Sequence, residues 1–193
     1  MTDMARMTRA ESQAQTRSQL IATARQMFFT DGYHPTSLEK VADAAGYSKG
    51  AVYSNFRNKD ELCVAVLDEM RADRFTEVLD VVAKPDRFEA LRDWAESVIG
   101  DPGWTPLEAE FAVHARRDEH LRAELAARLD GIIEMLANGV ESTDDLDLKM
   151  PSREAATVML ALGVGLGLMR SIDPSTPVNG LVDTLRLVAG QHF

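Results

Sequence analysis

Residues 36–58 read TSLEKVADAAGYSKGAVYSNFRN, and this stretch predicts two short helices joined by a tight turn. Its first half places Leu38, Val41, Ala42 and Ala45 at the spacing of one apolar helical face. Gly46 follows where the chain must reverse, a position that favours a residue tolerating left-handed backbone angles. Two helices joined in this way form a helix-turn-helix, a motif that lays its second helix in the DNA major groove.

The polar residues at the helix starts support this interpretation. Thr36 with Glu39 three residues later makes the T-x-x-E pattern of a capping box. Ser48 is a good N-cap for the second helix, in which Val52 and Phe56 lie one turn apart on the inner side. We therefore expect helices that begin at these caps.

The outer side of the second helix offers candidates for contact with DNA. At 100° per residue, Gly50, Tyr53 and Ser54 lie away from the apolar side, and Gly50 lets another surface approach the backbone closely. Lys49, in the first turn, can reach a phosphate or a guanine edge. Lys59, in the first turn of the next helix, suits a phosphate because a helix N-terminus also supplies N–H groups.

Charge is divided unevenly along the chain. The 193 residues carry a net charge of −10, but residues 1–60 carry +2 and residues 61–193 carry −12. A mildly basic start on an acidic remainder predicts nucleic-acid binding confined to the N-terminal part.

Composition narrows the remaining classes. The single cysteine, Cys63, excludes an internal disulfide and a cysteine-based zinc site. Asp144, Asp145 and Asp147 lack the glycine and glutamate of a calcium loop, so we expect no metal and no cofactor. The N-terminus lacks the continuous apolar segment of a secretory signal, and no uninterrupted apolar run approaches about 20 residues. We therefore expect a cytoplasmic protein that does not span a membrane.

Helical periodicity continues through the rest of the chain and predicts an all-α fold of about nine helices. Residues 1–15 are polar without periodicity and predict a flexible N-terminal arm, before a first helix at 16–30. After the fourth helix, which begins near Asn58, the expected helices cover 87–99, 106–117, 118–137, 152–171 and 181–188.

Three motifs resemble the N-terminal domain of the tetracycline-repressor (TetR) family of bacterial regulators. They are F-x-x-x-G-Y-x-x-T-S from Phe28, A-x-x-A-G-Y-S-K-G-A-V-Y over residues 42–53, and N-F-x-N-K-D-E-L over residues 55–62. The resemblance implies a three-helix DNA-binding head at 16–60, with the helix-turn-helix at about 37–56. It also implies a helical ligand-binding and dimerisation body at 61–193.

The same resemblance assigns roles to residues of the head. It implies phosphate contacts from Thr36, Ser37, Tyr53 and Lys59. The residues implied to contact bases are Ser48, Lys49, Gly50, Ser54 and Asn55.

For the body, the resemblance implies a homodimer formed through the last two helices and a pocket for a small-molecule effector. Gly163 and Gly167 would form a shallow groove for a helix, unless they serve packing within one chain. The dimer candidates are Gly163, Gly167, Leu181, Leu185 and Val188. The pocket candidates, which suit an apolar or amphipathic effector, are Trp94, Trp104, Phe111, His114, Met135 and Met159.

The function that follows is a ligand-responsive regulator, most simply a repressor, that binds a palindromic DNA operator as a homodimer. An activator or dual regulator of the same fold is the alternative. An enzyme using His114, His120, Glu110 and Glu119 is more remote, because the sequence lacks a nucleophile elbow, a metal-ligand set and a phosphate loop. A helical interaction protein without DNA binding also remains open.

Overall fold

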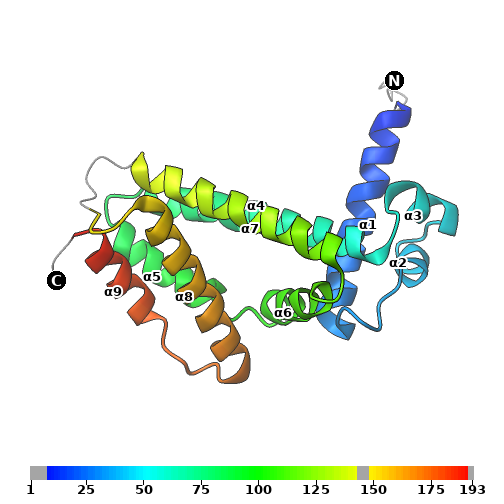
Figure 1. Cartoon of the computed structure of the whole chain (residues 1–193). Helices are drawn as coiled ribbons and strands as arrows, with labels where there is room; N and C mark the ends of the chain where they lie inside the picture. The colour runs from blue at the N-terminus through cyan, green and yellow to red at the C-terminus, as the bar shows by residue number, and fades with distance from the viewer. Residues whose placement is uncertain (1–7, 143–147, 191–193) are drawn as a thin grey trace, which may run out of the picture. The chain divides into compact units, whose positions relative to one another are not determined.

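A computed structural model of the chain describes residues 8–142 and 148–190. Over these residues the chain forms nine helices and no strand, which confirms the predicted all-α fold (Figure 1). The helices are α1 (Arg9–Asp31), α2 (Leu38–Ala44), α3 (Lys49–Asn55), α4 (Lys59–Val82), α5 (Arg87–Val98), α6 (Trp104–Ala115), α7 (Glu119–Glu141), α8 (Ser152–Ile172) and α9 (Asn179–Val188).

Packing divides the chain into two compact units. The N-terminal unit is Met1–Asp73 and the C-terminal unit is Arg74–Phe193, with the division inside α4. The functional division at residue 60 remains a prediction.

Helix α1 begins earlier than the periodicity predicts. Thr8 and Glu11 form a capping box, in which Glu11 N donates to Thr8 Oγ1 at 3.2 Å and Thr8 N donates to Glu11 Oε2 at 2.7 Å. The predicted arm at 1–15 is therefore wrong for residues 9–15, which are helical, while residues 1–7 lie outside the described part. Apolar periodicity does not reveal residues 9–15 as helix, because their side chains are exposed and form no buried apolar face.

The core of the N-terminal unit uses the apolar stripes expected from the sequence. Leu20, Ala24 and Phe28 of α1 are buried, as are the inner residues of α2 and α3. Helix α1 packs on both α2 and α3, which also pack on each other. Each fully buried large apolar side chain contributes about 1.5–3 kcal/mol. This core therefore fixes the short helices α2 and α3, which would be marginal in isolation.

The cap of α2 differs from the prediction by one residue. Ser37 is the N-cap, and its Oγ accepts from Lys40 N at 3.3 Å. Thr36 is 2% exposed, and its Oγ1 donates to the carbonyl oxygen of Gly32 at 2.9 Å. The predicted capping box of Thr36 with Glu39 is therefore wrong. The shift leaves the Glu39 side chain to make a different contact.

The turn between α2 and α3 is formed as predicted. Gly46 has a φ of 74°, and Tyr47 N donates to the Ala42 carbonyl oxygen at 2.8 Å, which closes the end of α2. Ser48 then caps α3, since its Oγ accepts from Ala51 N at 3.2 Å. The predicted Asn58 cap of α4 is also confirmed, because Glu61 N donates to Asn58 Oδ1 at 2.8 Å.

The C-terminal unit is built around α8. This helix packs along α7 and also contacts α6 and α9, while α5 packs on α9 (Figure 1). One core cluster joins Ala95, Val178 and Leu181, with Trp94 and Met159 packed against it among others.

Helices α6, α7 and α9 extend beyond their predicted bounds, and α9 begins at Asn179 where 181 was predicted. Helix α6 begins at Trp104, two residues before Pro106, because Asp101 Oδ1 accepts from the N–H groups of both Gly103 and Trp104. Helix α7 continues to Glu141, into the loop expected from Asn138. The acidic residues 144–147 of that loop lie outside the described residues. The predicted Asp118 cap of α7 is confirmed, since its carboxylate accepts from Leu121 N at 3.0 Å.

Helix α8 has the length and apolar composition of a membrane-spanning helix, which was not expected from the sequence. Among the described residues it is the one helix long and apolar enough to cross a membrane, and 17% of its most apolar 18-residue window is buried. Length and composition are weak evidence for a span, since a core helix of a soluble protein passes the same test. What the observation establishes is a long apolar helix with much of its surface uncovered by its own chain.

Candidate DNA-binding surface and effector body

Helix α3 has a buried inner side and an exposed outer side. Val52 is 0% exposed, and Phe56, just after the helix, is 1% exposed. On the other side Lys49, Gly50 and Ser54 are exposed, together with Tyr53 at 49%. The structure therefore places Lys49, Gly50 and Ser54, three of the predicted base-contacting residues, on one accessible surface, whereas Asn55 is half-buried.

Gly50 lies open on this surface. A Cβ built there would meet only Ser48 Oγ within 4 Å, at 3.8 Å. Packing within the chain therefore does not require glycine at this position. Its absence of a side chain suits the close approach of an external surface to the helix backbone.

Ser54 and Asn55 are engaged within α3 itself. Ser54 Oγ donates to the Ala51 carbonyl oxygen at 2.8 Å, and Asn55 Nδ2 donates to the same oxygen at 2.9 Å. A base contact by either residue would exchange one of these local bonds for a bond to DNA.

Arg17 holds the end of α3 in place, and the sequence analysis gave it no role beyond its charge. Its NH1 donates to the Asn55 carbonyl oxygen at 2.8 Å, across 38 residues of sequence. Its guanidinium also lies 4.2 Å from the centre of the Phe56 ring, at cation–π distance. No local pattern reveals such a contact, because it depends on how α1 packs against α3.

The predicted phosphate contacts lie in unequal surroundings. Ser37 is partly exposed at the start of α2, whereas Thr36 is buried with its hydroxyl bonded to Gly32. Lys59 Nζ donates to the carbonyl oxygens of Tyr33 at 3.0 Å and His34 at 3.3 Å. Thr36 and Lys59 thus support the loop between α1 and α2, in addition to any contact that Lys59 makes with its remaining N–H.

Burial explains the electrostatics beneath Lys59. Its Nζ lies 4.0 Å from the centre of the buried Tyr33 ring, and desolvation lowers the pKa of the ammonium group. The Tyr33 hydroxyl donates to the Asp60 carboxylate, and burial followed by that hydrogen bond raises the pKa of Tyr33. The cluster fixes the start of α4 against the preceding loop.

Tyr53 makes a contact that the sequence analysis did not foresee. Its hydroxyl donates to Glu39 Oε1 at 2.5 Å, which links the exposed sides of α3 and α2. The hydrogen bond raises the pKa of Tyr53 and lowers that of Glu39.

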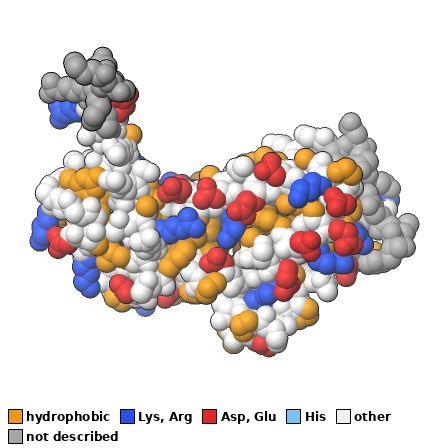
Figure 2. Space-filling view, turned by 180° about the vertical axis from the view of Figure 1, so that it is seen from behind, with side chains coloured by type: hydrophobic (Ala, Val, Ile, Leu, Met, Phe, Trp, Pro, Cys, Tyr) orange, Lys and Arg blue, Asp and Glu red, His pale blue; other side chains and the backbone are white. Residues whose placement is uncertain are grey.

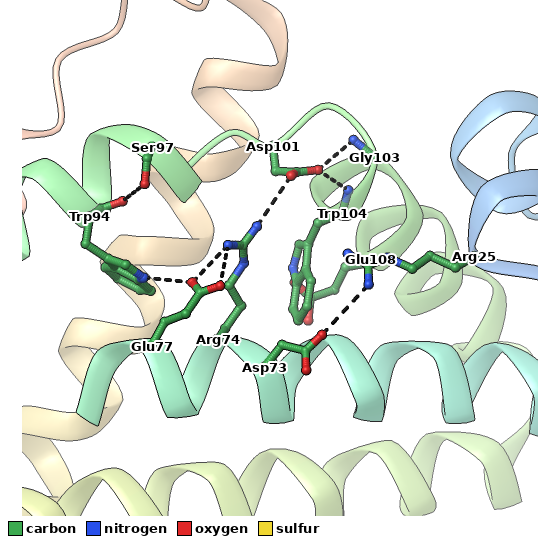
Figure 3. A network of polar contacts seen from close by, with 10 residues as sticks. All are labelled: Arg25, Asp73, Arg74, Glu77, Trp94, Ser97, Asp101, Gly103, Trp104 and Glu108. Carbon is green, nitrogen blue, oxygen red and sulfur yellow. Dashed lines mark hydrogen bonds and ion pairs between the residues drawn. The ribbon is translucent and has the colours of Figure 1, made fainter. Parts of the chain in front are cut away.

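The six pocket candidates come from four helices of the C-terminal unit, α5 to α8, and make separate contacts. Trp94 Nε1 donates to Glu77 Oε2 at 3.0 Å, and Trp104 Nε1 donates to Glu108 Oε2 at 2.9 Å. Figure 3 shows Arg74 between the two indoles, where it pairs with Glu77 and with the Asp101 that caps α6.

The remaining pocket candidates are also dispersed. Phe111 is buried and stacks on His114 with ring centres 6.1 Å apart. Met159 packs in the core beside Trp94, while Met135 is 38% exposed on α7. A shallow polar depression lies elsewhere, and none of the six candidates lines it. Its lining is Arg92, Asp93, Glu96 and residues 174–179.

The dimer candidates divide into inner and outer residues. A Cβ on Gly167 would lie 3.3 Å from Thr105 Oγ1, and Leu181 is 7% exposed in the core cluster. These two residues therefore serve packing within the chain. A Cβ on Gly163 would meet nothing within 4 Å, and Leu185 and Val188 are partly exposed.

The larger apolar surface of α8 was not predicted from the sequence. Val158, Leu162, Gly165, Met169 and Ile172 follow one another at helical spacing along one face. Their exposed fractions reach 56% at Met169 and 81% at Ile172. The glycine pattern drew attention to small residues, but the exposed aliphatic side chains mark this face more clearly.

Charged side chains of both signs are present elsewhere on the protein surface. Figure 2 shows acidic and basic side chains interspersed on the face that it draws. Many form ion pairs, such as Arg170 with Glu96 at 3.0 Å and Arg92 with Asp183 at 3.1 Å.

Comparison with known proteins identifies the family. Residues 20–66 match the model of the bacterial regulatory proteins of the tetR family. The chain is 30% identical to the transcriptional regulator TtgR of Pseudomonas putida over 169 residues, which cover 88% of this chain and 71% of that relative. It is 31% identical to a helix-turn-helix transcriptional repressor of Mycobacterium tuberculosis, over 64% of this chain and 83% of the relative.

Solved structures show the same fold at lower identity. A TetR-family regulator from Rhodococcus aligns with a TM-score of 0.73 and 18% identity, covering 91% of this chain and 99% of the other. Reduced NemR of Escherichia coli aligns with a TM-score of 0.68 and 19% identity, covering 90% and 97%.

A helix-turn-helix on a helical body, with these relatives, defines a DNA-binding transcriptional regulator. The chain belongs to the TetR family. Members of this family are regulators and not enzymes, so the enzyme alternative built on His114, His120, Glu110 and Glu119 is set aside.

Proposed function

We propose that the protein is a ligand-responsive repressor that acts as a cytoplasmic homodimer on a palindromic DNA operator. The observation that carries the proposal is the outer surface of α3, where Lys49, Gly50, Tyr53 and Ser54 are exposed. Val52 and Phe56 anchor the helix from behind. Such a helix can enter the major groove without disturbing the core.

Contacts on this surface divide by role. Ser37, Tyr53 and Lys59 position the head on phosphates, while Ser48, Lys49, Gly50, Ser54 and Asn55 face the bases. Thr36 contributes indirectly, because its hydroxyl holds the loop between α1 and α2 in place. Phosphate contacts set affinity for all DNA, whereas base contacts set sequence preference.

The homodimer is supported by the apolar face of α8. Val158, Leu162, Met169 and Ile172 are all at least 36% exposed, and Leu187 of α9 is 55% exposed. Large contiguous apolar faces mark interaction surfaces in soluble proteins. Two copies meeting through α8 and α9 would present two heads to half-sites roughly 34–36 Å apart.

An apolar or amphipathic effector suits the C-terminal unit because its helices carry tryptophans, phenylalanine and methionines beside a few polar groups. An effector that binds better to a form with unsuitable head spacing would weaken operator binding by differential affinity. The repressor sign is supported by the relative from Mycobacterium tuberculosis, which is named a repressor.

Selection of genomic fragments by the purified protein tests the proposal. A fragment bound much more tightly than random duplex DNA, with affinity that falls steeply with salt, is the expected result. Transcription from that fragment in vitro separates a repressor from an activator. A protein that binds every duplex equally, or none, would overturn sequence-specific regulation.

A further inference from the structure

The Glu39 carboxylate lies among the groups that the proposed function assigns to DNA. Tyr53 Oη donates to Glu39 Oε1 at 2.5 Å, although half of the Tyr53 side chain is exposed and water is available to it. The bond joins α2 to α3 across the surface between the proposed phosphate contacts.

Further donors surround the same carboxylate. Three interactions lower the pKa of Glu39, the largest being the Tyr53 hydrogen bond, followed by its own backbone N–H and the Ser37 hydroxyl. The positive charge of Lys49 acts in the same direction. The carboxylate is therefore ionised at neutral pH, bonded to the Tyr53 hydroxyl and stabilised by the Ser37 hydroxyl, its own backbone N–H and the charge of Lys49.

These four groups are the kinds of donor that hold DNA phosphates. Serine and tyrosine hydroxyls, lysines and N–H groups at helix N-termini account for many contacts to phosphate oxygens. In the free protein their shared anionic partner is a side chain of the chain itself. A phosphate and the Glu39 carboxylate cannot both occupy this position, because two anions repel and Tyr53 has one hydroxyl hydrogen to donate.

We propose that Glu39 stands in for a DNA phosphate in the free protein and must leave Ser37 and Tyr53 before the backbone of DNA can bind there. The inference rests on the proposed function, since it assumes that these residues meet phosphate. Glu39 then competes with phosphate and weakens DNA binding by a constant factor. It lowers affinity for operator and random DNA by the same factor and leaves their ratio unchanged.

Competition with phosphate differs from a structural role in which Glu39 only holds α2 to α3. If Glu39 stabilised the DNA-binding arrangement, its removal would weaken binding. If Glu39 competes with phosphate, its removal strengthens binding. The sign of the effect therefore separates the two roles.

The test compares Glu39→Gln with wild-type protein on two duplexes of equal length, one a fragment selected from genomic DNA and one random. Glu39→Gln removes the charge while keeping the size of the side chain. The amide oxygen of glutamine can still accept from Tyr53, but more weakly than a carboxylate, and it does not repel a phosphate. We therefore expect Glu39→Gln to tighten binding to both duplexes by about three- to ten-fold.

Asp43→Asn supplies the matched control. Asp43 is exposed on α2, one helical turn beyond Glu39, so its neutralisation changes the same charge on the same helix. Long-range repulsion is screened by salt, so we expect the smaller gain from Asp43→Asn to fade at high salt. The gain from Glu39→Gln should persist, because competition for Tyr53 acts at contact distance.

A double-mutant cycle with Tyr53→Phe links the effect to its partner. In the Tyr53→Phe background, Glu39→Gln should tighten binding less than it does in the wild type. Equal gains from Glu39→Gln and Asp43→Asn at all salt concentrations would overturn the proposal. So would weaker binding by Glu39→Gln, or a gain independent of Tyr53.

Failure of this inference can be told from failure of the proposed function. If wild-type protein prefers its selected fragment over random DNA while Glu39→Gln has the same affinities as wild type, only the proposed competition by Glu39 is wrong. If wild-type protein shows no preference for any fragment, the proposed function itself fails. Circular dichroism of each variant establishes that the helices are intact.

Discussion

Replacement of Arg17 by alanine should loosen α3 without touching its outer surface. Arg17 spans two elements, because its NH1 donates to the Asn55 carbonyl oxygen at 2.8 Å and its guanidinium lies over the Phe56 ring at 4.2 Å. A hydrogen bond from a charged group contributes about 1.5–3 kcal/mol. A partly exposed cation–π contact adds about 0.5–1 kcal/mol.

Because Arg17 is partly exposed, we take the lower end of both ranges and expect Arg17→Ala to lower the free energy of unfolding by about 2 kcal/mol. Arg17→Lys should fall between alanine and wild type, since an ammonium group can donate to Asn55 but lacks the flat guanidinium face. Urea unfolding followed by circular dichroism measures the loss, provided that the slope with denaturant is unchanged.

The same variants test whether the stability of α3 affects DNA binding. A looser α3 should bind the selected fragment more weakly and discriminate less against random DNA, because the surface that meets the bases is less fixed. Arg17→Ala with wild-type stability and weaker binding to every duplex would refute this reasoning. Arg17 would then be a phosphate contact rather than a support for α3.

Four further outcomes follow from particular contacts. Gly46→Ala should destabilise the protein by about 1–2 kcal/mol in urea unfolding, because alanine must adopt the φ of 74° although space is open there. Lys59→Ala should weaken binding to all sequences alike, whereas Ser54→Ala should alter preference at one base position, as competition with single-base variants would reveal. Met169→Glu should shift the protein from dimer to monomer in sedimentation, since a charge replaces a side chain that is 56% exposed on α8. The Asp118 cap lowers the pKa of that carboxyl, so its stabilisation should be complete above the ordinary pKa of about 4 and lost at lower pH, in contrast to an Asp118→Asn variant.

Local patterns predicted much of the N-terminal unit. Apolar spacing gave the buried sides of α2 and α3, and the caps at Ser48 and Asn58 were assigned correctly. The Thr36 cap was wrong because the chain offers two adjacent residues that can cap a helix. The backbone of the preceding turn, where Gly32 accepts from Thr36, decides between them.

The polar contacts of the surface were less accessible to sequence reasoning. Arg17 with Asn55 and Tyr53 with Glu39 join residues that are 38 and 14 positions apart. Such pairs have no period and no fixed spacing, so they emerge only when the helices are packed. The roles of the body candidates stay predictions for a related reason, because a tryptophan or methionine at helical spacing looks the same in a core, on a pocket wall and on a dimer face.

The polar groups of the proposed DNA surface are largely bonded to one another before DNA arrives. Ser37 caps α2, Ser54 and Asn55 donate to Ala51, and Tyr53 donates to Glu39. Binding must therefore exchange internal hydrogen bonds for bonds to DNA, and each exchange yields less than a new bond would. The exposed Lys49 acts through its charge, and the release of counterions from DNA adds to its contribution. Affinity should thus come mainly from charge, whereas the bonds exchanged at Ser54 and Asn55 should select sequences, because only these two of the four are proposed to face the bases.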